Sequence, residues 1–313
     1  MIEKLVIGTR GSKLALWQAN YVADLLKARY PAIQVVLKNI VTTGDKILDV
    51  PLAKIGGKGL FTKELEKELL SGEIDLAVHS LKDMPTQLPP GLTLGAVTER
   101  MDARDALVSD TYTGVDTLPQ GARVGTSSLR RKAQLLHYRP DLIIKDLRGN
   151  LDTRLAKLRN SELDAIVLAV AGLTRLNWER HIAQILPEDI CLPAVGQGAL
   201  AIETRENDEA VLNVLSCLHH EQTAQITVAE RAFLNWVEGN CQVPIGVYGR
   251  ITEEGLVLQA VILSVDGRLR LEDRETGHLE DAYQIGARLA QRMYNSGGRE
   301  ILAELRDTQE ARS

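Results

Sequence analysis

The sequence has few aromatic residues and no excess of positive charge. Only 4% of its 313 residues are Phe, Trp or Tyr, so it lacks the stacking side chains on which single-stranded nucleic acids are usually bound. Its net charge of −5 gives no overall attraction to DNA or to an anionic membrane. Both deficits argue against a nucleic-acid or membrane partner, and any basic patch would have to be local.

Cysteines are also few. Cys191, Cys217 and Cys241 form no CxxC motif, and their spacing suggests neither a metal site nor a disulfide framework. We expect Cys191 and Cys217 to be small buried residues. Cys241 lies in a polar loop, EGNCQVPIG, where a thiol is easily exposed. The residues alone leave two interpretations open, an unreactive thiol and a nucleophile or attachment point.

Long hydrophobic runs are missing as well. The longest, Ala165–Leu173, is far too short to cross a bilayer. The N-terminal sequence MIEKLVIGTRGSK has no apolar signal core followed by a cleavage site. We therefore expect a cytoplasmic protein.

Strand and helix patterns alternate through the first two thirds of the chain. Leu5–Thr9 predicts a short strand, and Ser12 is placed to cap a helix that runs to about Arg29. A second alternating series follows Thr98–Asp105, a charged segment that we interpret as a hinge. Alternation of this kind favours parallel sheets with helices on their faces.

The two halves of this region resemble each other. GTRGS at 8–12 and GTSSLR at 125–130 both follow a predicted strand and open a predicted helix. GEIDLAV at 72–78 and SELDAIV at 161–167 both read as a helix end followed by a strand. The repetition predicts two α/β domains of similar plan that face each other across a cleft.

Beyond Glu221 the pattern changes. A predicted helix, Gln222–Val237, precedes three strand-like runs with hairpin turns between them, and further helices follow. This part predicts a smaller α+β domain, with Cys241 in the loop between its first helix and its first strand.

A local basic region does occur, at Gly121–Asn160, which holds ten Lys or Arg residues and three acidic residues. It fits a solvated helix face, a nucleic-acid site, or a cleft for a polycarboxylate or phosphate. Position favours the cleft. Arg130 and Arg131 follow a Thr-Ser-Ser run at a predicted helix N-terminus, where free N–H groups already favour an anion. Arg148 and Arg10 hold similar strand-to-helix junctions, where α/β sheets bind ligands.

The run HSLKDMP places Lys82 and Asp83 side by side at the end of a predicted strand. One interpretation is a surface turn closed by Pro85. The other is a carboxylate that points into the anion cleft. A carboxylate there would repel an anionic ligand unless it stabilises a cation or moves a proton.

The polar stretch from 42 to 59 is too long for a simple connection. It is either a disordered linker or a mobile lid over an anionic ligand, with Lys54, Lys58 and the following Phe61 as lid residues. Its GGKG does not have the spacing of a P-loop, so we infer no nucleotide.

These motifs together resemble the porphobilinogen deaminase (hydroxymethylbilane synthase) family over essentially the whole chain. The matching runs are IGTRGSKLALWQA, PLAKIGGKGLFTKELE, DLAVHSLKDMP, VGTSSLRRKAQL, LRGNLDTRLAKL, DAIVLAVAGLTRL, LPAVGQGAL and EGNCQVPIG. The resemblance implies a transferase of heme biosynthesis that joins four porphobilinogen molecules head to tail with loss of ammonia. Water then releases linear hydroxymethylbilane, which passes to uroporphyrinogen-III synthase.

The resemblance also implies residue roles. Cys241 would hold a dipyrromethane cofactor through a thioether, and Asp83 would be the catalytic residue. One departure is Asn240, where many members have glycine before the cysteine; Asn tolerates left-handed backbone. The cofactor-binding residues implied are Lys82, Asp83, Thr126, Ser128, Arg130, Arg131 and Arg148, and the substrate-binding residues are Arg10, Ser12, Arg148, Arg154 and Arg175.

The family fold has two domains like those of periplasmic binding proteins and a third that carries the cofactor. It implies a monomer with domain 1 at 1–98 and 199–217, domain 2 at 104–192 and domain 3 at 221–313. Two rival functions remain for a chain of this fold. One is a non-catalytic binding module for a small polyanion, and the other is the effector domain of a DNA-binding regulator.

Overall fold

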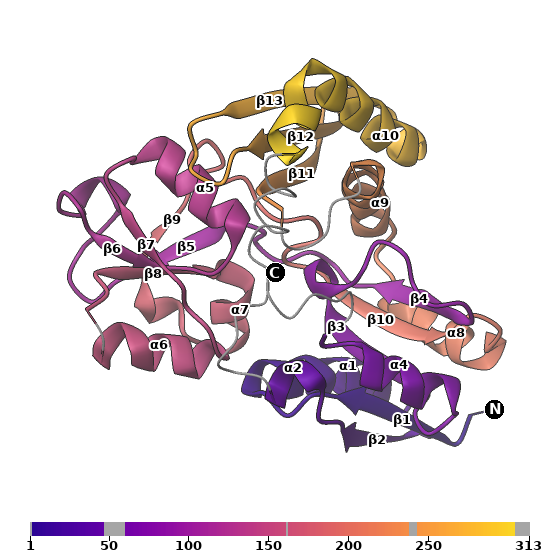
Figure 1. Cartoon of the computed structure of the whole chain (residues 1–313). Helices are drawn as coiled ribbons and strands as arrows, with labels where there is room; N and C mark the ends of the chain where they lie inside the picture. Colours follow the sequence, from indigo (N-terminus) through magenta and orange to yellow (C-terminus); the bar gives the residue numbers. More distant parts are fainter. Residues whose placement is uncertain (1, 47–59, 161, 238–242, 304–313) are drawn as a thin grey trace. The chain divides into compact units, whose positions relative to one another are not determined.

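The computed structural model describes residues 2–46, 60–160, 162–237 and 243–303, and Figure 1 labels their helices and strands. The chain divides into two compact units. Residues 1–101 and 198–224 form the first, and residues 102–197 and 225–313 form the second. None of the described helices combines the length and the apolar character needed to cross a membrane.

The first unit is built on a five-stranded sheet with strand order β2-β1-β3-β10-β4. Strands β2, β1 and β3 are parallel, whereas β10 runs antiparallel to both of its neighbours, β3 and β4. Their bounds are β1 Lys4–Thr9, β2 Gln34–Asn39, β3 Leu76–Ser80, β4 Leu92–Val97 and β10 Leu200–Arg205. The helices are α1 Lys13–Arg29, α2 Thr43–Lys46, α4 Lys63–Leu70 and α8 Glu209–Leu215.

Helix α1 begins where the sequence predicts. The side chain of Ser12 accepts a hydrogen bond from the backbone N–H of Ala15, which satisfies a donor that the first helical turn leaves open. Val22 and Leu26, four residues apart on one face of the helix, are fully buried in the core of this unit with Leu5 and Ile7 of β1. The apolar face of α1 therefore fixes the β1–α1 junction on the sheet.

The second unit contains another five-stranded sheet, with strand order β7-β6-β8-β5-β9. Strands β7, β6 and β8 are parallel, and β5 is antiparallel to β8 and β9. The strands are β5 Asp105–Val108, β6 Arg123–Gly125, β7 Ile143–Lys145, β8 Ala165–Ala169 and β9 Ile182–Ile185. The helices are α5 Leu129–Tyr138, α6 Leu151–Asn160 and α7 Val170–Arg175.

The two sheets share one plan, as the sequence repetition predicts. In the first, the backbone N–H of Asp75 donates to the carbonyl of Val6, and the Asp75 carboxylate accepts from the Val6 N–H. Asp164 makes the same pair of bonds with Arg123 in the second sheet. The aspartate of each repeated motif therefore ties the start of its strand to the neighbouring parallel strand.

Two expectations about these sheets are wrong. The sheets are mixed rather than parallel, because β10 and β5 are not reached through strand–helix–strand units and enter antiparallel. The predicted hinge also extends too far, since Asp105 is fully buried and begins β5.

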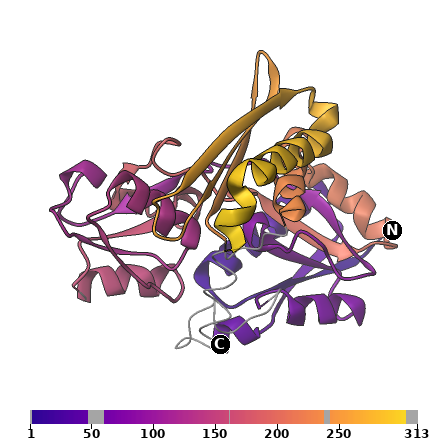
Figure 2. The same ribbon diagram turned by 45° about the horizontal axis from the view of Figure 1, so that its top comes forward.

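The chain from α9 onward adds a three-stranded antiparallel sheet in the order β11-β12-β13. Its elements are α9 Glu221–Trp236, β11 Ile245–Thr252, β12 Gly255–Leu263, β13 Arg270–Gly277 and α10 Ala282–Met293. Figure 2 shows α10 lying along this sheet. Phe233 of α9 and Ile285 of α10 are fully buried in the same core. The architecture confirms two α/β parts, each with a five-stranded sheet, and a smaller α+β part.

Glycines allow two close approaches in this part of the chain. A Cβ on Gly286 of α10 would overlap the carbonyl oxygen of Ala229 in α9. Gly267, in the turn after β12, has φ +74° and lies against the backbone of α5. Its carbonyl oxygen is 2.9 Å from Nδ1 of His137. The small sheet is thus joined to α5 within the second unit.

Candidate active site

Lys82 and Asp83 occupy a single 3-10 turn, Leu81–Asp83, that follows β3 directly. Leu81 and Met84, on either side of the pair, are buried. The N–H of Met84 closes the turn on the carbonyl of Leu81 at 3.1 Å. Because the apolar residues hold both ends, the turn leaves Asp83 exposed and Lys82 half-buried at the carboxyl end of the strand.

Arg10 follows β1, the parallel neighbour of β3, so both strands end at the same edge of the first sheet. Nε of Arg10 lies 3.2 Å from each carboxylate oxygen of Asp45, and its Nη2 also pairs with that carboxylate. The guanidinium carbon is 4.2 Å from the centre of the Phe61 ring. The predicted lid residue Phe61 thus contacts a predicted substrate-binding arginine, whereas Lys54 and Lys58 lie outside the described residues.

The junction between β6 and α5 contains the predicted cofactor-binding residues Thr126 and Ser128. Ser128 is the N-cap of α5, and its side chain accepts from the N–H of Arg131. The Thr126 hydroxyl accepts from the N–H of Ser128 at 3.2 Å. The hydroxyl of Ser127 donates to the carbonyl of Leu147 and accepts from its N–H. This loop is therefore fixed at both ends by hydrogen bonds that its hydroxyl residues supply.

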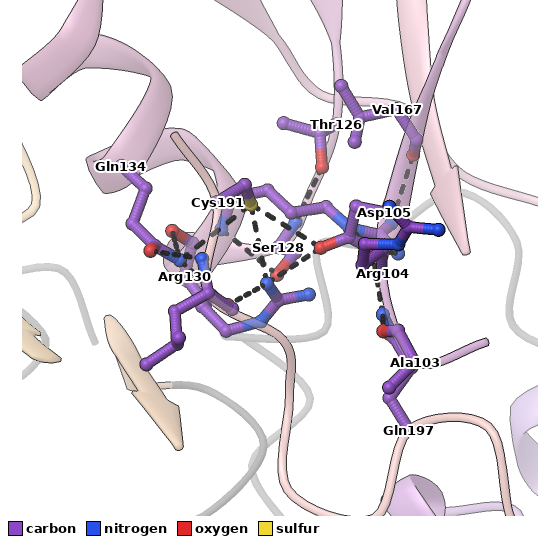
Figure 3. Close-up of polar contacts among 12 residues, drawn as sticks. Ala103, Arg104, Asp105, Thr126, Ser128, Arg130, Gln134, Val167, Cys191 and Gln197 are labelled. Carbon is purple, nitrogen blue, oxygen red and sulfur yellow. Dashed lines mark hydrogen bonds and ion pairs between the residues drawn. The ribbon is translucent and has the colours of Figure 1, made fainter. Parts of the chain in front are cut away.

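Arg130 and Arg131 are almost fully buried, and both pair with Asp105. Figure 3 shows Arg130 and Cys191 close to the Asp105 carboxylate. Nη1 of Arg130 and Nη2 of Arg131 each lie 2.7 Å from one oxygen of the Asp105 carboxylate. Arg131 also donates to the carbonyl of Val167, and Arg130 to that of Leu192. Two cations share one anion here, so the cluster keeps a positive charge inside the protein.

Burial alone would raise the pKa of Asp105, but the two guanidinium groups outweigh it and hold the pKa far below its usual range. Gln197 donates to the same carboxylate at 2.9 Å. Sγ of Cys191 is 3.4 Å from it, and burial raises the pKa of this thiol to about 12. We therefore expect Cys191 to be a neutral, inert thiol. Cys217, predicted to be buried, is exposed instead, because it lies in the turn after α8.

Sequence reasoning missed the partners of this cluster. Asp105, Cys191 and Gln197 lie between 25 and 94 positions from the residues to which they bond. A local pattern cannot pair residues over such separations. The one available signal was an acidic residue directly before the apolar run Ala106–Val108, because a charge next to a buried strand needs a partner.

The remaining arginines follow later strands of the second sheet. Arg148 lies in the loop between β7 and α6. Its Nη2 is buried, and no described residue accepts a hydrogen bond from it. Desolvation lowers the pKa of this guanidinium. Arg154, on α6, donates to the carbonyl of Gly149 at 2.9 Å, and Arg175 is buried at the end of α7. Arg148 therefore has a buried donor atom suited to an anionic ligand.

The structure thus distributes the predicted residues over both units, in loops and turns that follow strands and in the helices after them. The first unit carries Arg10, Ser12, Lys82 and Asp83, and the second carries Thr126, Ser128, Arg130, Arg131, Arg148, Arg154 and Arg175. Cys241, the predicted attachment point, lies outside the described residues.

One further polar cluster was not predicted. His79 of β3 lies 3.0 Å from the buried carboxylate of Glu203 in β10. Glu66 of α4 is buried nearby, and its Oε1 accepts from the hydroxyl of Thr62 at 2.5 Å. Burial raises the pKa of Glu66, and the neighbouring Glu203 charge adds to this effect. Ionisable groups are therefore buried in the sheet at β3, the strand that leads into the turn with Asp83.

Comparison with solved structures finds likeness at low identity. The methionine-binding protein MetQ is 15% identical, with a TM-score of 0.45 over 71% of this chain and 90% of that chain. The periplasmic VFT2 domain of Bordetella pertussis BvgS is 16% identical, with a TM-score of 0.41 over 69% of this chain and 86% of that domain. This likeness concerns the fold alone.

Two family models match the sequence. Residues 5–213 match "Porphobilinogen deaminase, dipyromethane cofactor binding domain", and residues 224–295 match "Porphobilinogen deaminase, C-terminal domain". A porphobilinogen deaminase of Trichlorobacter lovleyi is 52% identical over 97% of both chains. One of Desulforamulus reducens is 49% identical over 98% of this chain and 99% of the relative. The chain therefore belongs to the porphobilinogen deaminase family.

Proposed function

We propose that the protein joins four porphobilinogen molecules head to tail, with loss of four ammonias, and that water then releases the linear tetrapyrrole hydroxymethylbilane. The observation that carries this conclusion is the match over nearly the whole length of both this chain and its relatives. It supports an enzyme, a transferase of heme and porphyrin biosynthesis. Neither rival function, the binding module or the DNA-binding regulator, has comparable support.

The residues of the second unit fit a dipyrromethane cofactor, which carries four carboxylates. Arg148 has a buried Nη2 without an acceptor among the described residues, and the Arg130–Arg131–Asp105 cluster has an excess positive charge. The dipyrromethane group supplies, when bound, the primer from which the chain is extended. Thr126 and Ser128 would bind its carboxylates beside these arginines, Lys82 and Asp83 would also contact it, and Cys241 would hold it through a thioether.

Asp83 is the proposed catalytic residue. When ammonia leaves porphobilinogen, the C–N bond breaks with its electron pair going to nitrogen, and the remaining pyrrole becomes cationic. A carboxylate beside the pyrrole N–H stabilises this charge and moves a proton. The turn after β3 suits the task, because buried Leu81 and Met84 hold it while Asp83 stays exposed.

The substrate carboxylates are bound by Arg10, Ser12, Arg148, Arg154 and Arg175. Each porphobilinogen brings an acetate and a propionate, so every elongation step adds two negative charges. A charge-assisted hydrogen bond contributes about 1.5–3 kcal/mol. We therefore expect loss of one arginine to slow particular elongation steps by roughly ten- to a hundredfold.

The finer organisation is also a proposal. We infer three domains, at 1–98 with 199–217, at 104–192 and at 221–313, in a cytoplasmic monomer whose product passes to uroporphyrinogen-III synthase. The return of the chain to the first sheet through β10 supports the discontinuous first domain.

Two measurements test the assignment. The intact mass of the denatured, active protein should exceed the sequence mass by two linked pyrrole units, located on the peptide that contains Cys241. An unmodified Cys241 would refute the tether. Asp83→Ala should fold normally and nearly abolish tetrapyrrole formation, whereas Asp110→Ala, at an exposed position of the second unit, should have normal turnover. Normal turnover by Asp83→Ala would remove Asp83 from the mechanism.

A further inference from the structure

The guanidinium of Arg10 is already bound to a carboxylate of the protein itself. Its Nε contacts both oxygens of Asp45 at 3.2 Å, and Nη2 contacts one of them. This two-donor arrangement is the one by which arginine recognises any carboxylate. Asp45 therefore uses the same face of Arg10 that a carboxylate of the substrate would use.

Asp45 is held in this place by its own segment. Its carboxylate accepts hydrogen bonds from the N–H and the hydroxyl of Thr42, at 3.2 and 2.8 Å. Partial burial alone would raise the pKa of Asp45, but the bonds from Arg10 and Thr42 outweigh it and keep the pKa below its ordinary value. Asp45 is consequently an anion at neutral pH while it is paired with Arg10.

The residue before Asp45 in α2, Gly44, lies against an aromatic ring that contacts the same arginine. A Cβ on Gly44 would overlap the ring of Phe61, so only glycine lets this ring lie so close to the helix. The ring packs on the Arg10 guanidinium, and the N–H of Gly44 donates to the carbonyl of Leu60 at 2.9 Å. Arg10 thus contacts both the Asp45 carboxylate and the Phe61 ring, and a backbone hydrogen bond joins the two segments that carry them.

We propose that Asp45 is an internal competitor for Arg10, whose carboxylate must be displaced before a porphobilinogen carboxylate can take its place. The inference rests on the proposed substrate-binding role of Arg10. The side chains of Arg10 and Asp45 are 26% and 25% exposed, so water screens the pair and its exchange for another carboxylate costs little. Asp45 thereby raises the porphobilinogen concentration that the enzyme requires and selects against ligands that bind Arg10 weakly.

The opposite role is a positioning one, in which Asp45 orients Arg10 for the substrate. The two roles differ in the sign of their effect on KM. In Asp45→Asn a competitor is lost and KM should fall about two- to fivefold, the change in an equilibrium constant that a partly exposed ion pair supplies. Turnover at saturating porphobilinogen should not change. An unchanged or higher KM would overturn the proposal.

Asp208→Asn is the matched control. Asp208 pairs with Arg205 at 2.7 Å and with similar exposure, 22% and 25%, and it also accepts a backbone N–H bond. The KM of the Asp208→Asn variant for porphobilinogen should equal that of the wild type. A fall in KM equal to that of Asp45→Asn would show a general effect of surface charge and would also overturn the proposal.

A double-mutant cycle shows whether Asp45 acts through Arg10. In an Arg10→Gln background, Asp45→Asn should no longer lower KM; an equal fall there would refute the competition. Equilibrium binding of porphobilinogen in the Asp83→Ala background gives a second readout, in which Asp45→Asn should tighten binding by the same factor. A wild-type protein that forms no tetrapyrrole would refute the proposed function separately, while the binding measurement would still decide the role of Asp45.

Discussion

Asp105→Asn should strongly destabilise the protein, because it removes the only acidic side chain that the described structure places against two buried guanidinium groups. Asp105 is fully buried, and Arg130 and Arg131 are 5% and 6% exposed. Removing one partner of a buried ion pair costs about 3–5 kcal/mol, since the remaining charge is left uncompensated. For a unit of this size, that loss corresponds to a decrease in Tm of about 6–20 °C.

The dependence of this effect on pH follows from the lowered pKa of Asp105. A carboxyl group whose pKa is lowered on folding stabilises the folded state at every pH above its unfolded pKa, about 3.9. Below that pH the unfolded chain binds a proton that the folded one does not, and the contribution decreases. The stability difference between wild type and Asp105→Asn should therefore be constant from pH 5 to 8 and narrow in more acidic solution.

Urea unfolding followed by circular dichroism across this pH range measures both effects. Asp102→Asn is the control, because Asp102 also pairs with an arginine, Arg104, but is 30% exposed. It should cost no more than about 1 kcal/mol. The reasoning is refuted if Asp105→Asn destabilises the protein no more than Asp102→Asn does. It is also refuted if the stability difference between wild type and Asp105→Asn grows as the pH falls below 4.

Three other predictions concern single residues. A thiol reagent at pH 8 should label the exposed Cys217 of the native protein but label Cys191 only after unfolding, since burial raises the pKa of the Cys191 thiol to about 12. Peptide mapping shows the order in which the two cysteines are labelled, and rapid labelling of Cys191 in the native protein would contradict the prediction. Gly286→Ala should lower stability by about 1–3 kcal/mol, despite the better helix propensity of alanine, because its Cβ overlaps Ala229; a higher Tm would contradict the overlap. Between pH 4 and 7 the free energy of unfolding should decrease less in Glu66→Gln than in the wild type, because folding raises the pKa of Glu66 and the folded state is destabilised as this carboxyl ionises. Free energies from urea unfolding that fall equally with pH in both proteins would contradict this.

Local features were predicted well from the sequence. Ser12 caps the helix that it was expected to cap, because a hydroxyl before an apolar period satisfies open N–H groups over a span of three residues. The strand-to-helix junctions that carry Arg10 and Arg148 follow from the same short-range patterns. The family resemblance, carried by motifs along the whole chain, gave the proposed chemistry.

Features that depend on distant pairing could not be predicted in this way. The direction of β10 is set by hydrogen bonds to β3 and β4, which precede it by more than a hundred residues. Asp105 was assigned to a charged hinge because its own neighbours are charged, while its partners are remote. Nothing local distinguishes an Arg10 that is available to a ligand from one that Asp45 occupies, although Asp45 lies 35 positions away in an evidently polar stretch.

The position of β10 in the middle of the first sheet also governs the order in which the nascent protein can fold. Every strand of the second sheet, β5 to β9, has been synthesised by Ile185, whereas the gap between β3 and β4 is filled only by Leu200–Arg205. At about 5–20 residues per second, the ribosome needs roughly 5–20 s to make the intervening hundred residues. During that interval β3 and β4 have unpaired edges that can bind other chains. The sheet that is begun first is therefore completed last, and a slow stretch of translation before Leu200 would prolong its exposure to aggregation or to chaperones.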